Sequence, residues 1–313
     1  MKIVIAGGAG QVGTILACAF HARRDEVVVL SRAPAGAAWR VVQWDAATAG
    51  SWVAELDGAD VVIGLAGRSV NCRYTPENRR AIMDSRVRST RVLGQAIASV
   101  AHPPSVWLQA STATIYAHRF DAPNDDYTGV IGGHEPGVPA SWAFSIDVAR
   151  AWEAAVDAAG VPSRTVKMRT AVVMSPDRGG PFDILASLTR KGLGGRAADG
   201  RQWVSWLHHE DLVRAIDFLI QRDDLHGAIN LTSPNPIPNA ELMRALRQAL
   251  HAPVGLPAAR WMLALGAVVM GTETELVLKS RRVAPARLLD AGFRFTWPDW
   301  PEAARALAVS LKA

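Results

Sequence analysis

The chain has 313 residues, of which 49% are hydrophobic and 20% are charged, and its formal net charge is +5. This length and composition describe an ordinary soluble globule with a sizeable core, built as one large α/β domain with an appended lobe or as two modest domains. The longest apolar run, 261–271, is too short to span a bilayer and predicts a buried helix or a lid helix.

The cysteines and the charge balance exclude several other classes. Cys18 and Cys72 have no metal-ligand spacing and form no disulfide framework, and the N-terminus enters a strand without a basic leader, so we expect a cytoplasmic protein. The pI near 9.6 fits an anionic cofactor or a polar or anionic small-molecule substrate. Nucleic acid is not expected, because the arginines are scattered and no basic strand interleaved with aromatic residues occurs.

The N-terminal segment joins an apolar strand to a glycine-spaced turn. Gly7 allows the tight strand-to-helix turn, Gly10 lets the backbone approach a pyrophosphate, and Gly13 lets the next helix pack against the strand. Gln11 and Val12 open that helix, whose free N–H groups and positive dipole end favour phosphates. The segment therefore predicts a bound dinucleotide.

The second predicted strand, 26–30, indicates which dinucleotide. An NAD-selective site usually carries Asp or Glu at its end for the ribose 2′-hydroxyl, whereas this chain has Ser31 and Arg32. Ser31 can hydrogen-bond a 2′-phosphate, and Arg32 can pair with it and stack on adenine. A solvated arginine at a strand end is the alternative. The pattern favours NADP(H) over NAD(H).

Strand and helix patterns then alternate, which predicts a Rossmann-type doubly wound parallel sheet with helices on both faces. The further predicted strands are 40–44, 61–65, 105–108 and 163–168, and the predicted helices are 12–20, 52–57, 76–101 and 142–159. We assign residues 1–178 to an NADP(H)-binding domain and 179–313 to a smaller substrate lobe. Segment 228–231 is expected to return in part to the sheet.

Several motifs resemble the extended short-chain dehydrogenase/reductases, and more narrowly the atypical branch of NAD(P)-dependent epimerase-family proteins. They include Leu65-Ala66-Gly67, the helix segment 84–91, the Gly-Arg-Gln-Trp run at 200–203 and the Pro-Asn-Pro segment at 234–236. The resemblance spans nearly the whole chain. It implies a Rossmann fold and an oxidoreductase or epimerase activity.

The resemblance also implies cofactor contacts beyond the glycine turn. Trp44 and Asp45 follow the third strand, where the family places an acidic residue beside the adenine. Leu65, Ala66 and Gly67 would contact the adenosine ribose and the pyrophosphate through their backbone. On the long helix, Arg86 can face the cofactor, with a solvated helix face as the alternative.

The catalytic pattern of the family is broken in this chain. A working member uses Tyr-x-x-x-Lys on a helix, in which the lysine holds the ribose and lowers the tyrosine pKa. None of the three tyrosines, Tyr74, Tyr116 and Tyr127, has a lysine four residues later. The matching helix places Phe144 at the tyrosine position and Val148 at the lysine position, and neither side chain can transfer a proton.

The remaining candidate catalytic residues follow the fifth strand. Thr112 or Ser111 stands where a hydroxyl would touch a substrate carbonyl or alcohol, although such a hydroxyl also satisfies backbone at strand ends. Tyr116 is the tyrosine expected near the site. It would stack on the substrate or the nicotinamide, or replace the missing acid, and simple packing is the alternative.

The second lobe supplies the expected substrate contacts, namely Arg201, Trp203 and Trp206. Val204 stands where UDP-sugar epimerases often carry an arginine for the diphosphate, which argues against a UDP-sugar substrate. No metal site is expected, because the two histidines His208 and His209 lack the further ligands that a metal site needs.

Two functional hypotheses remain open from the sequence. The first is an NADP(H)-dependent oxidoreductase or epimerase with altered acid–base chemistry. The second is an NADP(H)-binding sensor or scaffold without chemistry, which the missing Tyr-x-x-x-Lys pair motivates. A homodimer formed through two long helices is possible in both.

Overall fold

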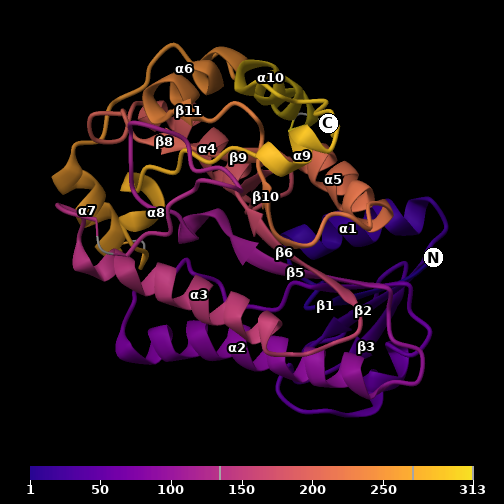
Figure 1. Ribbon diagram of the computed structural model, residues 1–313. Coiled ribbons are helices and arrows are strands. Elements are labelled where there is room, and N and C mark those ends of the chain that lie inside the picture. Colours follow the sequence, from indigo (N-terminus) through magenta and orange to yellow (C-terminus); the bar gives the residue numbers. More distant parts are fainter. Residues whose placement is uncertain (134, 270, 312–313) are drawn as a thin grey trace.

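The computed structural model describes residues 1–133, 135–269 and 271–311. Its centre is a parallel seven-stranded sheet in the order β10-β6-β5-β4-β1-β2-β3, as Figure 1 shows. The strands are β1 (Lys2–Ala6), β2 (Glu26–Ser31), β3 (Arg40–Gln43), β4 (Val61–Gly64), β5 (Val106–Thr112), β6 (Arg164–Thr170) and β10 (Gly227–Leu231). The expected doubly wound parallel sheet is thereby confirmed.

The central strands are nearly continuous apolar runs because both faces of the sheet are covered. In β1, Ile3 and Ile5 face one hydrophobic cluster, whereas Val4 and Ala6 face another. Helices α1 (Gln11–Ala22) and α5 (His209–Gln221) cover the first face, and α2 (Pro76–Ser99) and α3 (Ala143–Asp157) cover the second. This arrangement leaves the carboxyl ends of the strands, where such sheets bind ligands, open to the second lobe.

The second lobe has its own core around Trp206 and Trp300, whose rings meet edge to face at 5.1 Å. Its elements are β7 (Val172–Met174), α4 (Pro181–Leu188), β8 (Trp203–Val204), β9 (Trp206–His208), β11 (Ile237–Pro238), α6 (Asn239–Ala249), α7 (Arg260–Val269), α8 (Glu275–Leu278), α9 (Ala286–Asp290) and α10 (Trp300–Ser310). The chain also returns to the main sheet here, since β10 pairs with β6. The domain boundary at residue 178 stays a prediction.

Two predicted helices differ from the structure. The segment predicted as a helix at 52–57 forms a short 3₁₀ helix, Ser51–Glu55, because it only has to bury Trp52 under the sheet. The apolar segment expected to be buried or to form a lid is α7, and most of its large side chains are exposed, which corrects the expectation of a buried helix and leaves the lid helix a prediction. Among the described residues, no helix combines the length and the apolar composition that crossing a bilayer requires.

Candidate functional site

The glycine turn after β1 is closely packed at two of its three glycines. A Cβ on Gly7, which has φ +79°, would lie 2.6 Å from the Ala66 Cα, and one on Gly13 would lie 2.4 Å from Gly8. No atom lies within 4 Å of the corresponding position on Gly10. The packing thus requires glycine at Gly7 and Gly13, while Gly10 leaves open space at the helix start.

That open space adjoins unpaired donors at the N-terminus of α1. Gly10 caps the helix without a side-chain hydrogen bond, and no acidic residue lies in the first turn. The N–H groups there, including those of Gln11 and Val12, suit a phosphate. The Gln11 side chain points elsewhere, because its Nε2 donates to Ser175 Oγ at 2.6 Å. These residues fit a dinucleotide pyrophosphate through their backbone.

At the end of β2, Ser31 and Arg32 differ in whether their side chains are free to bind a 2′-phosphate. The Ser31 hydroxyl is nearly buried and exchanges hydrogen bonds with the backbone of Ala33, at 3.1 and 3.2 Å, so it holds the turn. Arg32 is exposed and forms no ion pair with another described residue. Arg32 is therefore the side chain that can meet a 2′-phosphate.

The residues predicted beside the adenine have structural roles of their own. Trp44 is 4% exposed and packs edge to face on Trp52 at 5.3 Å, so its ring cannot stack on a cofactor. The carboxylate of Asp45 accepts from the N–H groups of Ala47 and Thr48 and from the Thr48 hydroxyl, which lower its pKa to about 2. Trp44 could therefore meet a cofactor only through its backbone, and Asp45 is exposed but already forms a turn.

The segment after β4 connects the glycine turn to a cavity. Leu65 N–H donates to the Ala6 carbonyl at 2.8 Å, which sets Ala66 against Gly7. A Cβ on Gly67 would lie 3.2 Å from the Arg86 guanidinium carbon. The Arg86 guanidinium lies over the Trp152 ring and donates to the Arg68 carbonyl. Arg86 also lines the cavity.

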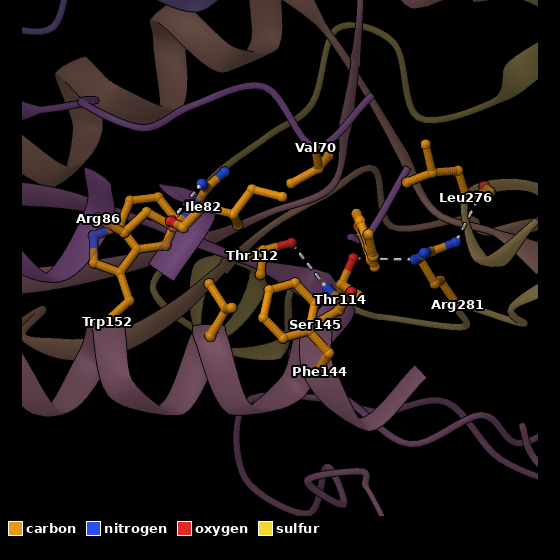
Figure 2. Close-up of a pocket in the computed structure, with 12 residues that line it drawn as sticks. Val70, Ile82, Arg86, Thr112, Thr114, Phe144, Ser145, Trp152, Leu276 and Arg281 are labelled. Atoms are coloured by element: carbon orange, nitrogen blue, oxygen red, sulfur yellow. Dashed lines mark hydrogen bonds between the residues drawn. The ribbon is translucent and has the colours of Figure 1, made fainter. Parts of the chain in front are cut away.

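Figure 2 shows this cavity, which has a volume of about 110 Å³ and is lined from α2, β5, α3 and α8. Its apolar wall consists of Val70, Ile82, Phe144, Val148, Trp152 and Leu276. Its polar wall consists of Tyr74, Arg86, Thr112, Thr114, Ser145 and Arg281. Ligand pockets usually have about 300–1,000 Å³, so only part of a ligand enters this cavity.

The cavity gathers the positions at which the sequence departs from the dehydrogenase pattern. Phe144 and Val148 line it from α3, together with Thr112 from the end of β5. The Thr112 hydroxyl accepts from the Thr114 N–H at 3.1 Å and remains on the cavity wall. Thr112 is therefore the predicted hydroxyl that the structure places in the cavity.

A tyrosine that the sequence reasoning passed over lines the same cavity. Tyr74, in the loop before α2, packs edge to face on Phe144 with ring centroids 5.1 Å apart. Burial raises the pKa of the Tyr74 phenol, and a hydrogen bond with Ser145 opposes the rise. Tyr74 follows a strand that ends at the ligand-binding edge of the sheet, and this position was the signal that could have identified it.

Behind Tyr74 lies a buried charged pair from α8 and the residue after it. Ser145 Oγ donates to Glu275 Oε2 at 2.7 Å, and Glu275 Oε1 is 3.7 Å from Lys279 Nζ. Both charged side chains are at most 2% exposed, and Lys279 Nζ also donates to the Thr114 carbonyl. Burial and the charge of Arg281 lower the pKa of Lys279 to about 8. Glu275 and Lys279 have the i, i+4 spacing of a helical ion pair, but no short spacing in the sequence places them against Ser145 and Thr114.

The structure corrects the placement of Ser111 and Tyr116, which belong to a buried network away from the cavity. Ser111 Oγ donates to Glu153 Oε1 at 2.6 Å, and Glu153 accepts two hydrogen bonds of 2.8 Å from Arg169. Arg169 also donates to the Tyr116 hydroxyl, which donates to Asn230 Oδ1, each at 2.9 Å. Tyr116 is 2% exposed, and its hydroxyl is saturated by partners.

The three residues expected to contact the substrate do not line the cavity. Trp206 is fully buried in the core of the second lobe, so its expected role is corrected. Trp203 lies under the Arg282 guanidinium, 4.3 Å from its ring centroid, and Arg201 is exposed. The second lobe instead reaches the cavity through Leu276 and Arg281.

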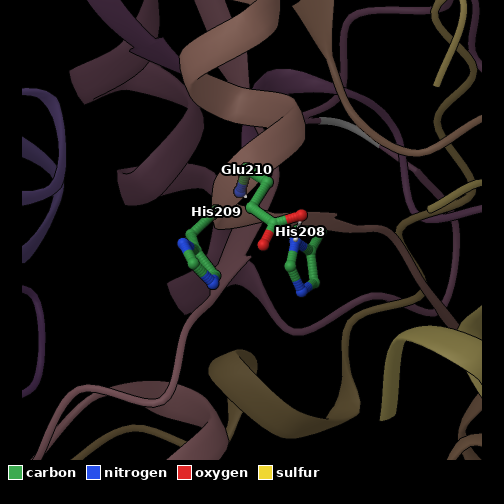
Figure 3. A group of neighbouring side chains, drawn as sticks. All are labelled: His208, His209 and Glu210. Carbon is green, nitrogen blue, oxygen red and sulfur yellow. Dashed lines mark hydrogen bonds and ion pairs between the residues drawn. The ribbon is translucent and has the colours of Figure 1, made fainter. Parts of the chain in front are cut away.

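His208, His209 and Glu210 are the one group of possible metal ligands among the described residues, and their ligand atoms lie within 4.8 Å of one another (Figure 3). The His208 Nδ1 accepts from the Glu210 N–H at 3.2 Å, which caps α5. The His208 and His209 rings face each other with centroids 4.5 Å apart. The capping of α5 by His208 and the packing of the two rings explain why His208 and His209 lie side by side.

His208 makes the stability of the protein depend on pH. Burial and the charge of His209 lower the pKa of His208 to about 4, whereas the ordinary value is about 6.5. As the pH falls, the unfolded chain binds this proton at a higher pH than the folded protein does. The free energy of unfolding is therefore greatest above about pH 6.5 and falls by up to about 3 kcal/mol towards pH 4. Denaturant unfolding across this range measures the loss. The His208→Asn variant keeps a capping acceptor and should show a shallower slope; an equal slope would contradict this assignment.

Comparisons with known proteins agree with this fold. The model of the NAD dependent epimerase/dehydratase family matches residues 3–231, and that of a domain of unknown function (DUF1731) matches residues 258–307. Epimerase family protein Mb2239 of Mycobacterium bovis is 31% identical over 298 residues, covering 94% of this chain and 93% of the relative. Epimerase family protein YfhF of Bacillus subtilis is 29% identical over 305 residues, with 96% and 95% covered.

The crystal structure of human epimerase family protein SDR39U1 (isoform2) with NADPH is similar throughout. Its TM-score is 0.85 at 26% identity, and the match covers 99% of this chain and 100% of the human chain. These matches confirm the resemblance to atypical extended short-chain dehydrogenase/reductases. The chain belongs to the NAD dependent epimerase/dehydratase family.

Proposed function

We propose that the protein is an NADP(H)-dependent oxidoreductase or epimerase that acts on a small polar or anionic molecule, with Tyr74 as its proton-transferring residue. The observation that carries this proposal is the cavity that Tyr74 and Thr112 line together with Phe144 and Val148. The cavity adjoins the glycine turn through Gly67 and Arg86. A cofactor-binding turn and a transferable proton thus occur at one site.

The residues present fit a dinucleotide with a 2′-phosphate. The open space at Gly10 and the uncapped start of α1 suit the pyrophosphate, and Arg32 suits the 2′-phosphate. The human relative was crystallised with NADPH, which supports the same preference here. When bound, the nicotinamide cofactor would supply or accept a hydride.

Replacing Arg32 by alanine should therefore weaken NADPH more than NADH. Loss of a hydrogen bond between charged groups costs about 1.5–3 kcal/mol, so we expect an NADPH dissociation constant raised about 10- to 100-fold and an NADH constant changed little. Titration of cofactor fluorescence measures both constants. Arg80, exposed on α2, provides a matched Arg80→Ala control. Equal weakening of both cofactors by Arg32→Ala would remove Arg32 from phosphate recognition.

The chain's own groups can perform the proton transfer. In the reductive direction, the Tyr74 hydroxyl gives its proton to the substrate oxygen while Thr112 hydrogen-bonds that oxygen. The Tyr74 phenol is protonated at neutral pH and can donate its proton, and because burial raises its pKa the transfer is harder than in relatives whose lysine lowers the tyrosine pKa. Ser145, anchored by Glu275, lines the same cavity as Tyr74. The apolar side chains of Phe144, Val148 and Trp152 limit water in the cavity.

Deuteride transfer tests the function itself. The protein is incubated with a metabolite extract and NADPH deuterated at the nicotinamide C4 position, and labelled products are sought by mass spectrometry. Deuterium that appears in a product only when the protein is present would establish an oxidoreductase and identify its substrate class. Absence of label despite measured NADPH binding would favour an NADP(H) sensor or an epimerase that returns its own hydride. Because epimers have equal mass, chromatographic separation of the metabolites before mass spectrometry would distinguish these two.

A further inference from the structure

Helix α7 presents large apolar side chains to solvent. Trp261, Met262, Leu265, Val268 and Val269 are 44–79% exposed. Their spacing of one, four, seven and eight residues places them on one side of the helix. The opposite side carries the buried Ala267 and is held on the lobe. A helix on a protein surface normally exposes its polar side chains and buries its apolar ones. The exposed apolar stripe of α7 therefore indicates a surface that another molecule covers.

Basic residues surround this stripe. Backbone hydrogen bonds from Leu256 to Gly192, from Ala258 to Arg196 and from Ala198 to Ala258 join the segment before α7 to the segment 190–198. This neighbourhood exposes the cations Arg190, Lys191, Arg196 and Arg260, and the apolar side chains Leu193, Val254 and Leu256. We name these residues, together with the five exposed residues of α7, the apolar–basic face. Figure 1 shows α7 at the edge of the C-terminal lobe.

Acidic residues are sparse in the segments of the apolar–basic face, and Asp199 and Glu273 stand just beyond them. The sequence has no Asp or Glu at 184–198 or at 250–272. None of its four cations forms an ion pair with another described residue. Arg260 also begins α7, where a positive charge opposes the helix dipole. Neither the stability of α7 nor ion pairs within the protein therefore explain these positive charges. An anionic binding partner outside the protein explains them.

We propose that the apolar–basic face docks on the surface of an anionic lipid membrane. An exposed apolar helix face with tryptophan at its edge and cations beside it inserts among acyl chains while the cations meet lipid phosphates. A second copy of this chain is disfavoured as the occupant, because it would bring a second set of the same cations against the first. This docking does not depend on the proposed function.

Vesicle co-sedimentation of the full chain tests the proposal. We expect binding to vesicles of mixed phosphatidylcholine and phosphatidylglycerol, weakened by salt, and little binding to pure phosphatidylcholine. The double variant Lys191→Gln, Arg260→Gln should bind the anionic vesicles about 25-fold more weakly, from about fivefold per cation. The double variant Leu265→Gln, Val268→Gln should bind at least about tenfold more weakly.

The matched control is Val309→Gln on α10, where valine is 69% exposed and lies outside the apolar–basic face. It should bind vesicles like the parent protein. Unfolding curves of the variants check that these surface changes leave the fold intact. Failure to pellet with anionic vesicles, or equal pelleting of all variants, would overturn the proposal. A dimer in light scattering that Leu265→Gln, Val268→Gln converts to a monomer, without vesicle binding, would identify a second copy as the occupant instead.

Discussion

Replacing Glu153 by alanine should lower the free energy of unfolding by about 3–5 kcal/mol, because it leaves Arg169 charged and buried without its partner. The two side chains are 9% and 14% exposed, and two hydrogen bonds join them. Glu153 and Tyr116 together hold the pKa of Arg169 above its ordinary range, so the guanidinium stays charged. Urea unfolding measures the effect as a lower transition midpoint with an unchanged slope.

The Arg40–Glu55 pair provides the control for this stability prediction. Its arginine side chain is 65% exposed, so Glu55→Ala should cost less than about 1 kcal/mol. A double variant Glu153→Leu, Arg169→Met, which removes both charges, should recover part of the stability lost in Glu153→Ala. A cost below about 1 kcal/mol for Glu153→Ala would show that Arg169 is compensated by other groups.

Replacing Tyr74 by phenylalanine should lower kcat by about 10²- to 10⁴-fold, the usual contribution of a positioned acid or base. The ring that packs on Phe144 remains, so the fold and the NADPH dissociation constant should be unchanged. The rate is measured as deuterium appearing in the product that the wild-type protein labels. Cofactor titration and thermal unfolding of the same variant separate lost chemistry from lost binding or folding.

Tyr127→Phe is the matched control for Tyr74→Phe. Tyr127 is 63% exposed and bonds to Asp290, away from the cavity, so its loss should leave the rate within about twofold. Thr112→Val should lower the rate less than Tyr74→Phe, since Thr112 donates one hydrogen bond without transferring the proton. An unchanged rate in Tyr74→Phe would exclude Tyr74 as the acid and leave Thr112 as the remaining hydroxyl to test.

The sequence alone was sufficient to predict the features that depend on residues adjacent in the chain. The apolar runs of β1, β2 and β4 predicted buried parallel strands, and the spacing of Gly7, Gly10 and Gly13 predicted a turn that a short stretch of backbone determines by itself. The absence of Tyr-x-x-x-Lys could likewise be read from the chain alone.

Apart from the 3₁₀ helix Ser51–Glu55 and the exposure of α7, the expectations that the structure corrected concerned the direction or burial of single side chains. Tyr116 and Trp206 stood in motifs that suggested a pocket, yet hydrogen bonding to Arg169 and packing on Trp300 placed both in the interior. Burial of an aromatic residue is decided by which other elements cover it, and those elements come from distant parts of the chain.

By itself, the sequence determined the fold class, the glycine turn after β1 and the absence of a Tyr-x-x-x-Lys motif, because each follows from residues within one helix, strand or turn. Only the tertiary structure decided which groups share the cavity. Tyr74 and Leu276 are about 200 residues apart in the chain and both line it, and Phe144 from α3 packs on the Tyr74 ring. No local pattern encodes such a meeting, since it depends on how the second lobe packs over the carboxyl ends of the strands.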